Sequence, residues 1–369
     1  MKLIFFNLCV SPHQMPYVNV LAHHPNVEYV GFVAPFIDID ERIVMGWNSA
    51  EKMNDKAVDF HIAPSDSDVE KLFELHRGDD THCIFAGINA FKQVAHWFKM
   101  SIKYNVKRSI MTEPPMIYER PLWMHALRFA IFDWRYVKHI DNMFVMGDRF
   151  VPYYQMWSKH WHVWPFMYCT NLQPQKEITS PTDEKLHVIY VGELCHRKNT
   201  MLLFKAIANS KILTEKVCVE VVGNGADWQV LEKYANENKL DVKFHGSQPM
   251  NKVSQFMQQN DVLVLPSRHD GWGAVVNEAL SLGLYVLCSD HCGSRYLINK
   301  LSAWNSKLGS VCGQVFHSCD VDNLTQKLQF CINNLQLIRQ TTTDRVSWSE
   351  KTISSQAVAQ RMINILTKD

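Results

Sequence analysis

Apolar residues in the second half of the chain recur in short blocks that are separated by longer amphipathic stretches. Five apolar runs predict β-strands, at residues 187–191, 217–222, 242–245, 262–265 and 285–288. The stretches between them have helical length, and Gly or Pro closes several of the runs. This alternation is typical of a doubly wound parallel sheet with helices on both faces.

The first half shows a similar alternation with less regular, aromatic-rich helices. Strands are predicted at residues 2–10, 27–33, 83–86, 108–112 and 142–146, and residues 160–164 alternate as a strand would. We interpret this half, residues 1–169, as a second α/β domain. The polar segment 170–184 contains two prolines and predicts a linker before a domain at 185–345. An apolar helical face between 347 and 366 predicts that residues 346–369 form a last helix packing across both domains.

Composition narrows the class of protein. The 369 residues include 38 Lys and Arg against 37 Asp and Glu, so bulk charge does not favour a nucleic-acid partner. Ten cysteines without a Cys-x-x-Cys pair indicate reduced thiols in a cytoplasmic protein. The apolar start is too short for a secretory signal, and no apolar run reaches the length of a membrane span. We therefore expect a soluble protein, or one at the inner face of a membrane.

The segment 261–283 carries the clearest chemistry. A buried strand leads into a loop in which Gly271 and Gly273 flank Trp272, directly before a helix. Asp270 lies in that loop, and Glu278 follows eight positions later. In a doubly wound sheet this is the carboxyl edge of a strand, where ligands bind. The glycines let a phosphate approach backbone N–H groups, and the Glu278 carboxylate suits the two hydroxyls of a ribose. The alternative is that Asp270 caps the helix and Glu278 is a solvated surface residue.

This pattern resembles the signature of the retaining GT-B glycosyltransferases of family 4. That signature is an acid, Gly, an aromatic residue, Gly, and a Glu eight positions after the first acid. Segments 190–199, 221–227, 243–246 and 347–351 resemble the family as well, so the likeness covers most of residues 186–366. It implies two Rossmann-like domains facing across a cleft. It also implies transfer of a hexosyl group from a nucleoside diphosphate sugar to a hydroxyl of a glycan or lipid-linked acceptor, with retained anomeric configuration and with no cofactor.

The resemblance also implies roles for single residues. Glu278 would hold the nucleotide ribose, and Lys198 with Arg197 would contact the diphosphate. Asp270 would contact the sugar and phosphates together with the backbone around it. The implied catalytic residues are thus Lys198, Arg197, Asp270 and Glu278, and the further donor-binding residues are Gly192, Asn224, Gly271, Trp272, Gly273 and Ala274.

The sequence departs from the family at two places. Glu193 stands where the family usually has Arg, so either Glu193 turns away to pair with a cation or Arg197 supplies the missing charge; we favour the second. The loop after the first strand contains no glycine. In this loop His13 is a candidate for contact with donor or acceptor, and Glu113 is a candidate on the acceptor side. An ordinary loop histidine and a surface carboxylate are the alternatives.

Residues 121–139 place Trp123, Leu127, Ile131 and Trp134 near one helical face. We interpret this face as core, with contact to a membrane surface as the alternative.

Other functions find weaker support. Three Asp-x-Asp pairs, which begin at residues 38, 66 and 320, could hold a divalent cation, and so could Cys288, His291 and Cys292. Neither set has the spacing or placement typical of a metal site. We therefore expect no metal. A dinucleotide oxidoreductase lacks the third glycine of its fingerprint, where Trp228 stands. Three alternative functions remain possible on the sequence alone: a sugar epimerase, a phosphorylase and a non-catalytic nucleotide-sugar binder.

Overall fold

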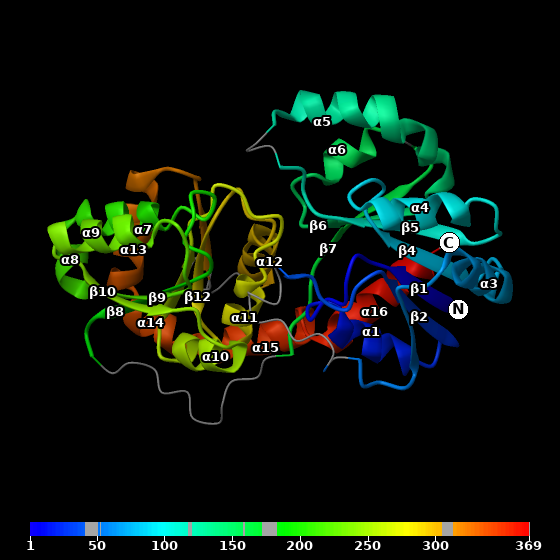
Figure 1. The fold of residues 1–369 in the computed structure, drawn as a ribbon. Coiled ribbons are helices and arrows are strands. Elements are labelled where there is room, and N and C mark those ends of the chain that lie inside the picture. Colours follow the sequence, from blue (N-terminus) through cyan, green and yellow to red (C-terminus); the bar gives the residue numbers. More distant parts are fainter. Residues whose placement is uncertain are drawn as a thin grey trace. The chain divides into compact units, whose positions relative to one another are not determined.

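The chain folds into two compact units, seen in a computed structural model (Figure 1). One unit comprises Met1–Cys169 and Ile353–Asp369, and the other comprises Thr170–Thr352. The structure describes residues 1–40, 51, 53–116, 120–157, 159–171, 183–304 and 313–368. Most of the predicted linker, residues 172–182, lies outside the described residues.

The first unit is built on a seven-stranded, all-parallel sheet with the order β3-β2-β1-β4-β5-β6-β7. Its strands are β1 (Lys2–Phe6), β2 (Tyr29–Ala34), β3 (Val58–Ile62), β4 (Thr81–Ala86), β5 (Lys107–Thr112), β6 (Asn142–Met146) and β7 (His162–Phe166). Its helices are α1 (Met15–Ala22), α3 (Asp66–His76), α4 (Lys92–Ser101), α5 (Leu122–Arg128), α6 (Val151–Gln155) and α16 (Ser355–Leu366). After α5 come a π-helical turn, η2 (Phe129–Asp133), and a 3-10 helix, η3 (Trp134–His139). The core is aromatic, with Phe6 stacked on Phe73 and Phe85.

The second unit has a six-stranded, all-parallel sheet with the order β10-β9-β8-β11-β12-β13. Its strands are β8 (Leu186–Val191), β9 (Val217–Val222), β10 (Asp241–Gly246), β11 (Val262–Leu265), β12 (Tyr285–Ser289) and β13 (Gly313–Phe316). Its helices are α7 (Thr200–Ala208), α8 (Lys211–Lys216), α9 (Trp228–Glu237), α10 (Met250–Gln258), α11 (Val275–Ser281), α12 (Arg295–Trp304), α13 (Val321–Asn333), α14 (Leu335–Gln340) and α15 (Thr342–Thr352). Its central strands are buried on both faces, which is why they read as continuous apolar runs.

The predicted α/β fold with two doubly wound parallel sheets is confirmed. Two strands, β3 and β13, have no counterpart in the predictions. Both lie at a sheet edge and are only partly buried. Edge strands carry mixed polar and apolar residues, so they lack the apolar signal that marks the central strands.

The single last helix expected over 346–369 is instead two helices, and the prediction was wrong on this point. α15 ends at Thr352, and α16 begins at Ser355. Ser354 lies between them with extended backbone, and its side chain accepts a hydrogen bond from the Ala357 N–H. Because this N-cap starts a new helix, the apolar periodicity from 347 to 366 does not correspond to one continuous helix. α15 packs on α11 in the second unit, and α16 packs on α1 in the first.

The apolar face of residues 121–139 is not core, which corrects the favoured interpretation. Trp123, Leu127, Ile131 and Trp134 are all exposed. Instead, the opposite side of the segment packs into the core of the first unit, through Phe129 and Val137. Helical spacing identified a common face but not its direction, because this segment has apolar residues on two faces.

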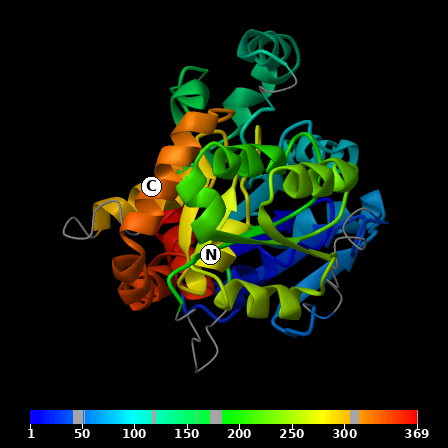
Figure 2. The same cartoon turned by 90° about the vertical axis from the view of Figure 1, so that its left-hand side faces the viewer.

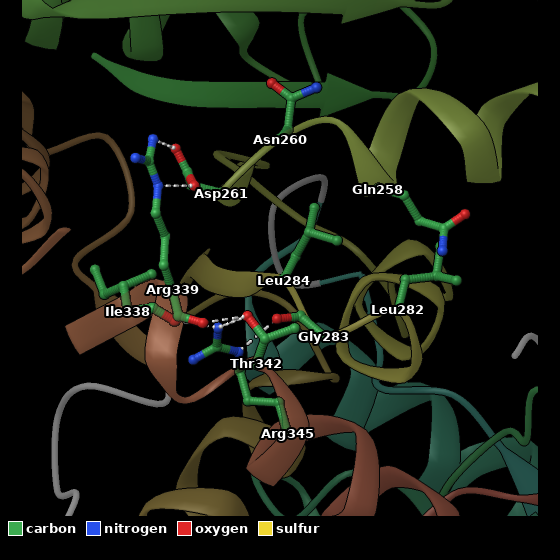
Figure 3. Close-up of a pocket in the computed structure, with 10 residues that line it drawn as sticks. All are labelled: Gln258, Asn260, Asp261, Leu282, Gly283, Leu284, Ile338, Arg339, Thr342 and Arg345. Carbon is green, nitrogen blue, oxygen red and sulfur yellow. Dashed lines mark hydrogen bonds and ion pairs between the residues drawn. The ribbon is translucent and has the colours of Figure 1, made fainter. Parts of the chain in front are cut away.

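A small cavity lies at the amino ends of β11 and β12 (Figure 3). It measures about 10 Å³, which is room for a single water molecule. Around it, Arg339 binds the buried carboxylate of Asp261, and Arg345 donates to the Gly283 carbonyl and to Thr341. These bonds tie α14 and α15 to the sheet. The cavity is thus part of the structural framework, at the edge opposite to the one where ligands bind in such sheets.

Candidate functional site

The strand order of the second unit reverses between β8 and β11, which are neighbours in the sheet. The segments that leave the carboxyl ends of these two strands therefore diverge, and such a point is the usual ligand site of a doubly wound sheet. Lys198 comes from the segment after β8, and Asp270 comes from the segment after β11. Their side chains meet in an ion pair with the Lys198 Nζ atom 2.5 Å from the Asp270 Oδ2 atom. Two residues 72 positions apart in the chain thus lie together at the switch point.

The ion pair is nearly enclosed, since the side chains of Lys198 and Asp270 are 15% and 11% exposed. Burial by itself raises the pKa of Asp270, but the charges of Lys198 and Arg197 outweigh it and hold this pKa below its usual value. Asp270 is therefore an ionised hydrogen-bond acceptor at neutral pH. An acceptor of this kind binds sugar hydroxyls, and the adjacent ammonium group binds phosphate oxygens.

A loop that the sequence suggested only as a weak metal site holds Asp270 in place. The backbone of residues 289–294 runs along the Asp270 loop: the Asp270 N–H donates to the His291 carbonyl, and the Gly293 N–H donates to the Asp270 carbonyl. Gly293 permits this approach, because a Cβ atom there would lie 2.3 Å from the Gly271 carbonyl oxygen. The only sequence signal for this contact is a single glycine after β12, and isolated glycines are too common to predict a contact.

Glycines also join the segments after β8 and β9. The Gly192 N–H donates to the Val222 carbonyl, and the Leu194 N–H donates to the Asn224 carbonyl. Gly223 has φ +139°, and a Cβ atom on it would lie 1.9 Å from the Gly192 carbonyl oxygen. Only glycine fits there without moving the backbone. The exposed Asn224 caps this turn by accepting a hydrogen bond from the Gly225 N–H.

Gly223→Ala is expected to separate these two segments and to destabilise the protein by about 2 kcal/mol or more, because backbone atoms cannot yield as a flexible side chain can. Gly246→Ala is the matched control. Gly246 also has a positive φ, +66°, but a Cβ atom there would meet nothing within 4 Å. The control should lose only about 1 kcal/mol. Urea unfolding of both variants measures the difference, and equal losses would contradict the proposed clash.

Glu193 and Arg197, the residues of the two alternatives for the missing charge, pair with each other. Its carboxylate lies 4.0 Å from the Arg197 guanidinium, so Glu193 pairs with a cation, and that cation is Arg197. Arg197 also donates to the His269 carbonyl in the Asp270 loop. Its side chain is 36% exposed, so the guanidinium remains accessible, and Arg197 adjoins Lys198 in the chain. A phosphate would compete with the Glu193 carboxylate for this guanidinium.

Glu278 lies in the first turn of α11, directly after the Asp270 loop. It is partly buried, and its carboxylate has no hydrogen-bonding or ionic partner among the residues that the structure describes. Burial raises the pKa of Glu278 to about 7. A buried carboxylate without a partner is costly, and this cost falls when a ligand donates hydrogen bonds to it. Glu278 is therefore poised to accept hydrogen bonds.

Glu278 should make stability depend on pH. Because burial raises its pKa from 4.5 to about 7, its contribution to stability is full below pH 4.5 and is lost as the pH rises through 7. The loss is at most about 3 kcal/mol. Glu278→Gln removes the titration, so relative to the wild type this variant should gain stability between about pH 5 and about pH 8. Urea unfolding at both pH values measures this gain; a constant difference between the two proteins would contradict the raised pKa.

The remaining residues of the loop have different surroundings. The Trp272 side chain is buried, and its indole N–H donates to the Asn277 side chain at 2.7 Å. Its indole thus faces the interior, and its backbone is the part left for a ligand. Gly273, with φ +90°, turns the chain into α11, which Ala274 precedes.

In the first unit, a residue absent from the predictions connects the two acceptor-side candidates. Tyr168, just after β7, donates its hydroxyl to the Glu113 carboxylate at 3.0 Å. Its ring lies 6.1 Å from the His13 ring, measured between centroids. His13, Glu113 and Tyr168 follow β1, β5 and β7, so they gather at the carboxyl edge of this sheet. This is the edge that binds ligands in such folds.

Several of the residues considered as metal ligands have structural roles in the fold. Asp320 caps α13, and Asp66 and Asp68 form the first turn of α3, where Asp68 completes a capping box with Ser65. Cys288 and Cys292 are buried, while His291 hydrogen-bonds the Arg268 carbonyl. Within the described parts of the chain, no three His, Cys, Asp or Glu side chains cluster as metal ligands would. In the same parts, no helix is both long and apolar enough to cross a bilayer.

Comparison with known proteins gives a match for the half that holds this site. Residues 173–344 match the family model described as Glycosyl transferases group 1. The chain is 31% identical over 134 residues to the putative teichuronic acid biosynthesis glycosyltransferase TuaC of Bacillus subtilis. It is 28% identical over 116 residues to the O-antigen biosynthesis glycosyltransferase WclY of Escherichia coli. The matches cover 36% and 31% of this chain, and about a third of the length of each relative, 31% in both cases.

Solved structures resemble the whole chain. Anabaena HepE in complex with UDP has a TM-score of 0.69 at 13% identity, and the lipopolysaccharide outer core galactosyltransferase WaaB in its apo form has 0.70 at 14%. Both alignments cover 100% of this chain and 100% of the other. The two parallel-sheet units thus have the fold of GT-B glycosyltransferases, which confirms the expected fold class.

Proposed function

We propose that this protein is a glycosyltransferase that moves a hexosyl group from a nucleoside diphosphate sugar to a hydroxyl of a glycan or lipid-linked acceptor. We further propose that the anomeric configuration is retained, as in family 4, and that neither a metal nor a cofactor takes part. The match of residues 173–344 to Glycosyl transferases group 1 supports the sugar transfer. Both curated relatives are named for biosynthesis of surface polymers, teichuronic acid and O-antigen, and we propose the same context for this chain, in the cytoplasm or at the inner face of a membrane.

The observation that carries the proposal is the nearly enclosed ion pair of Lys198 and Asp270 at the switch point, followed eight positions later in α11 by Glu278, whose carboxylate has no partner among the described residues. An ammonium group stabilises the charge that develops on the departing diphosphate. The ionised Asp270 accepts hydrogen bonds from hydroxyls of the sugar, and Glu278 accepts them from the ribose. The UDP and UDP-glucose complexes of the structurally similar HepE agree with a nucleotide-sugar ligand.

The chain's own residues then contribute binding and charge. Lys198 and Arg197 hold the diphosphate, and the backbone at Gly192, Asn224, Gly271, Gly273 and Ala274 lines the donor. His13 and Glu113, together with Tyr168, position the acceptor on the first unit. The departing phosphate accepts the proton of the acceptor hydroxyl, so positioning and charge stabilisation supply most of the rate enhancement.

A thermal-shift screen against UDP, GDP, ADP and dTDP, followed by turnover of the matching nucleotide sugar, tests the function. We expect one base to raise the melting temperature most, and sugar transfer to a glycan acceptor with the anomeric configuration retained by NMR. Donor consumption that requires inorganic phosphate would indicate a phosphorylase instead. Donor binding without turnover on any acceptor would indicate a non-catalytic binder, and the proposal would fail.

A further inference from the structure

The segment formed by α5, η2 and η3 exposes a row of large apolar side chains. Trp123 and Trp134 are 65% and 63% exposed, and Leu127, Ile131 and Phe132 are 54% to 55% exposed. We call these five residues the exposed stripe. Four of them recur at spacings of four, four and three residues, so they share one side of the helical segment. Figures 1 and 2 both show α5, in teal, at the margin of its unit and away from the sheet.

The opposite side of the segment is firmly packed. The Phe129 ring lies 4.6 Å from Trp157 and 6.0 Å from Trp161, between centroids. The Tyr136 ring meets Phe98 of α4 edge to face at 5.8 Å. The segment is therefore anchored in its unit, and its exposed stripe faces solvent. Large contiguous apolar surfaces of this kind are rare on proteins that work free in water, and they mark interaction sites.

Cations accompany the exposed stripe. Within the segment, residues 122–139, the chain carries Arg128, Arg135 and Lys138 against one acid, Asp133, although the whole chain has a net charge of only +1. All three cations are exposed. Asp133 is partly buried and bound to the Asn89 side chain. The surface around the stripe is therefore locally basic.

We propose that the exposed stripe docks this protein on an anionic phospholipid surface. Tryptophan side chains favour the headgroup region, and basic side chains beside an apolar helical face attract anionic lipids. The segment would lie in the plane of the interface with its stripe inserted. A second copy of the chain fits less well, because a symmetric contact would bring the same cations of both copies together.

Co-sedimentation with vesicles tests the proposal. The wild type should sediment with vesicles of equal parts phosphatidylglycerol and phosphatidylcholine, and at least tenfold less with phosphatidylcholine alone. The double variant Trp123→Ser, Trp134→Ser should bind the anionic vesicles at least tenfold more weakly. Leu75→Ser is the matched control, since Leu75 on α3 is 75% exposed but lies outside the stripe, and it should bind as the wild type does.

A charge variant makes the test independent of the tryptophans. Arg128→Gln with Arg135→Gln should weaken binding by about fivefold for each cation removed. Wild-type protein that leaves anionic vesicles in the supernatant would overturn the proposal, as would double variants that bind like the wild type. A dimer in size-exclusion chromatography that the Trp→Ser variant dissolves, without vesicle binding, would assign the stripe to a second copy instead. None of these readouts depends on sugar transfer, so they are separate from the test of the proposed function.

Discussion

Lys198→Ala is expected to lower turnover by about a hundredfold or more. The ammonium group lies 2.5 Å from Asp270 at the switch point, where we propose that the diphosphate departs. Its removal takes away the charge that stabilises the leaving group and leaves the enclosed Asp270 carboxylate without its ion-pair partner. Steady-state kinetics with the nucleotide sugar selected by the thermal screen measure the effect, which should appear mainly in kcat.

Two further variants separate this effect from a general loss of structure. Lys205→Ala removes an exposed lysine from α7, the helix that follows Lys198, and should leave turnover unchanged. Lys198→Arg keeps the positive charge and should recover part of the lost turnover. Wild-type kinetics in Lys198→Ala would count against the assigned role.

At about pH 8, above the raised pKa of Glu278, Glu278→Ala is expected to weaken binding of the nucleoside diphosphate by about ten- to a hundredfold, because hydrogen bonds to a charged acceptor contribute roughly 1.5 to 3 kcal/mol. The carboxylate has no partner among the described residues, so ligand hydroxyls would be its first hydrogen-bond donors. Isothermal titration calorimetry measures the loss. Glu232→Ala, an exposed acid on α9 in the same unit, is the control and should bind with wild-type affinity. Unchanged affinity in Glu278→Ala would exclude the ribose contact.

The buried strands and the Asp270 loop could be predicted from the sequence because they depend on local patterns. Strands such as β11 are continuous apolar runs, and the loop after β11 follows directly in the chain with its glycines and acids. The pairing of Lys198 with Asp270 was not predicted as a contact, but both residues were selected by the family resemblance. The structure adds the reason that they meet, since β8 and β11 are neighbours.

The remaining features depend on contacts between distant segments. Gly293 matters because its backbone lies against Gly271, and Tyr168 matters because it reaches Glu113 from β7. Neither residue carries a local signal of that contact. The exposed stripe and the break at Ser354 show the limit of periodicity. Periodicity tells which residues share a face, but neither what covers that face nor where a cap ends the helix.

The central claim is that Asp270 and Glu278 bind opposite ends of one nucleotide sugar. Calorimetry with Asp270→Asn and Glu278→Gln, each titrated with the nucleoside diphosphate and with its sugar, tests it most directly. We predict that Glu278→Gln weakens both ligands alike, whereas Asp270→Asn weakens the nucleotide sugar about tenfold and leaves the diphosphate within about twofold of the wild type. Equal effects of Asp270→Asn on both ligands, or no effect of either variant, would contradict the claim.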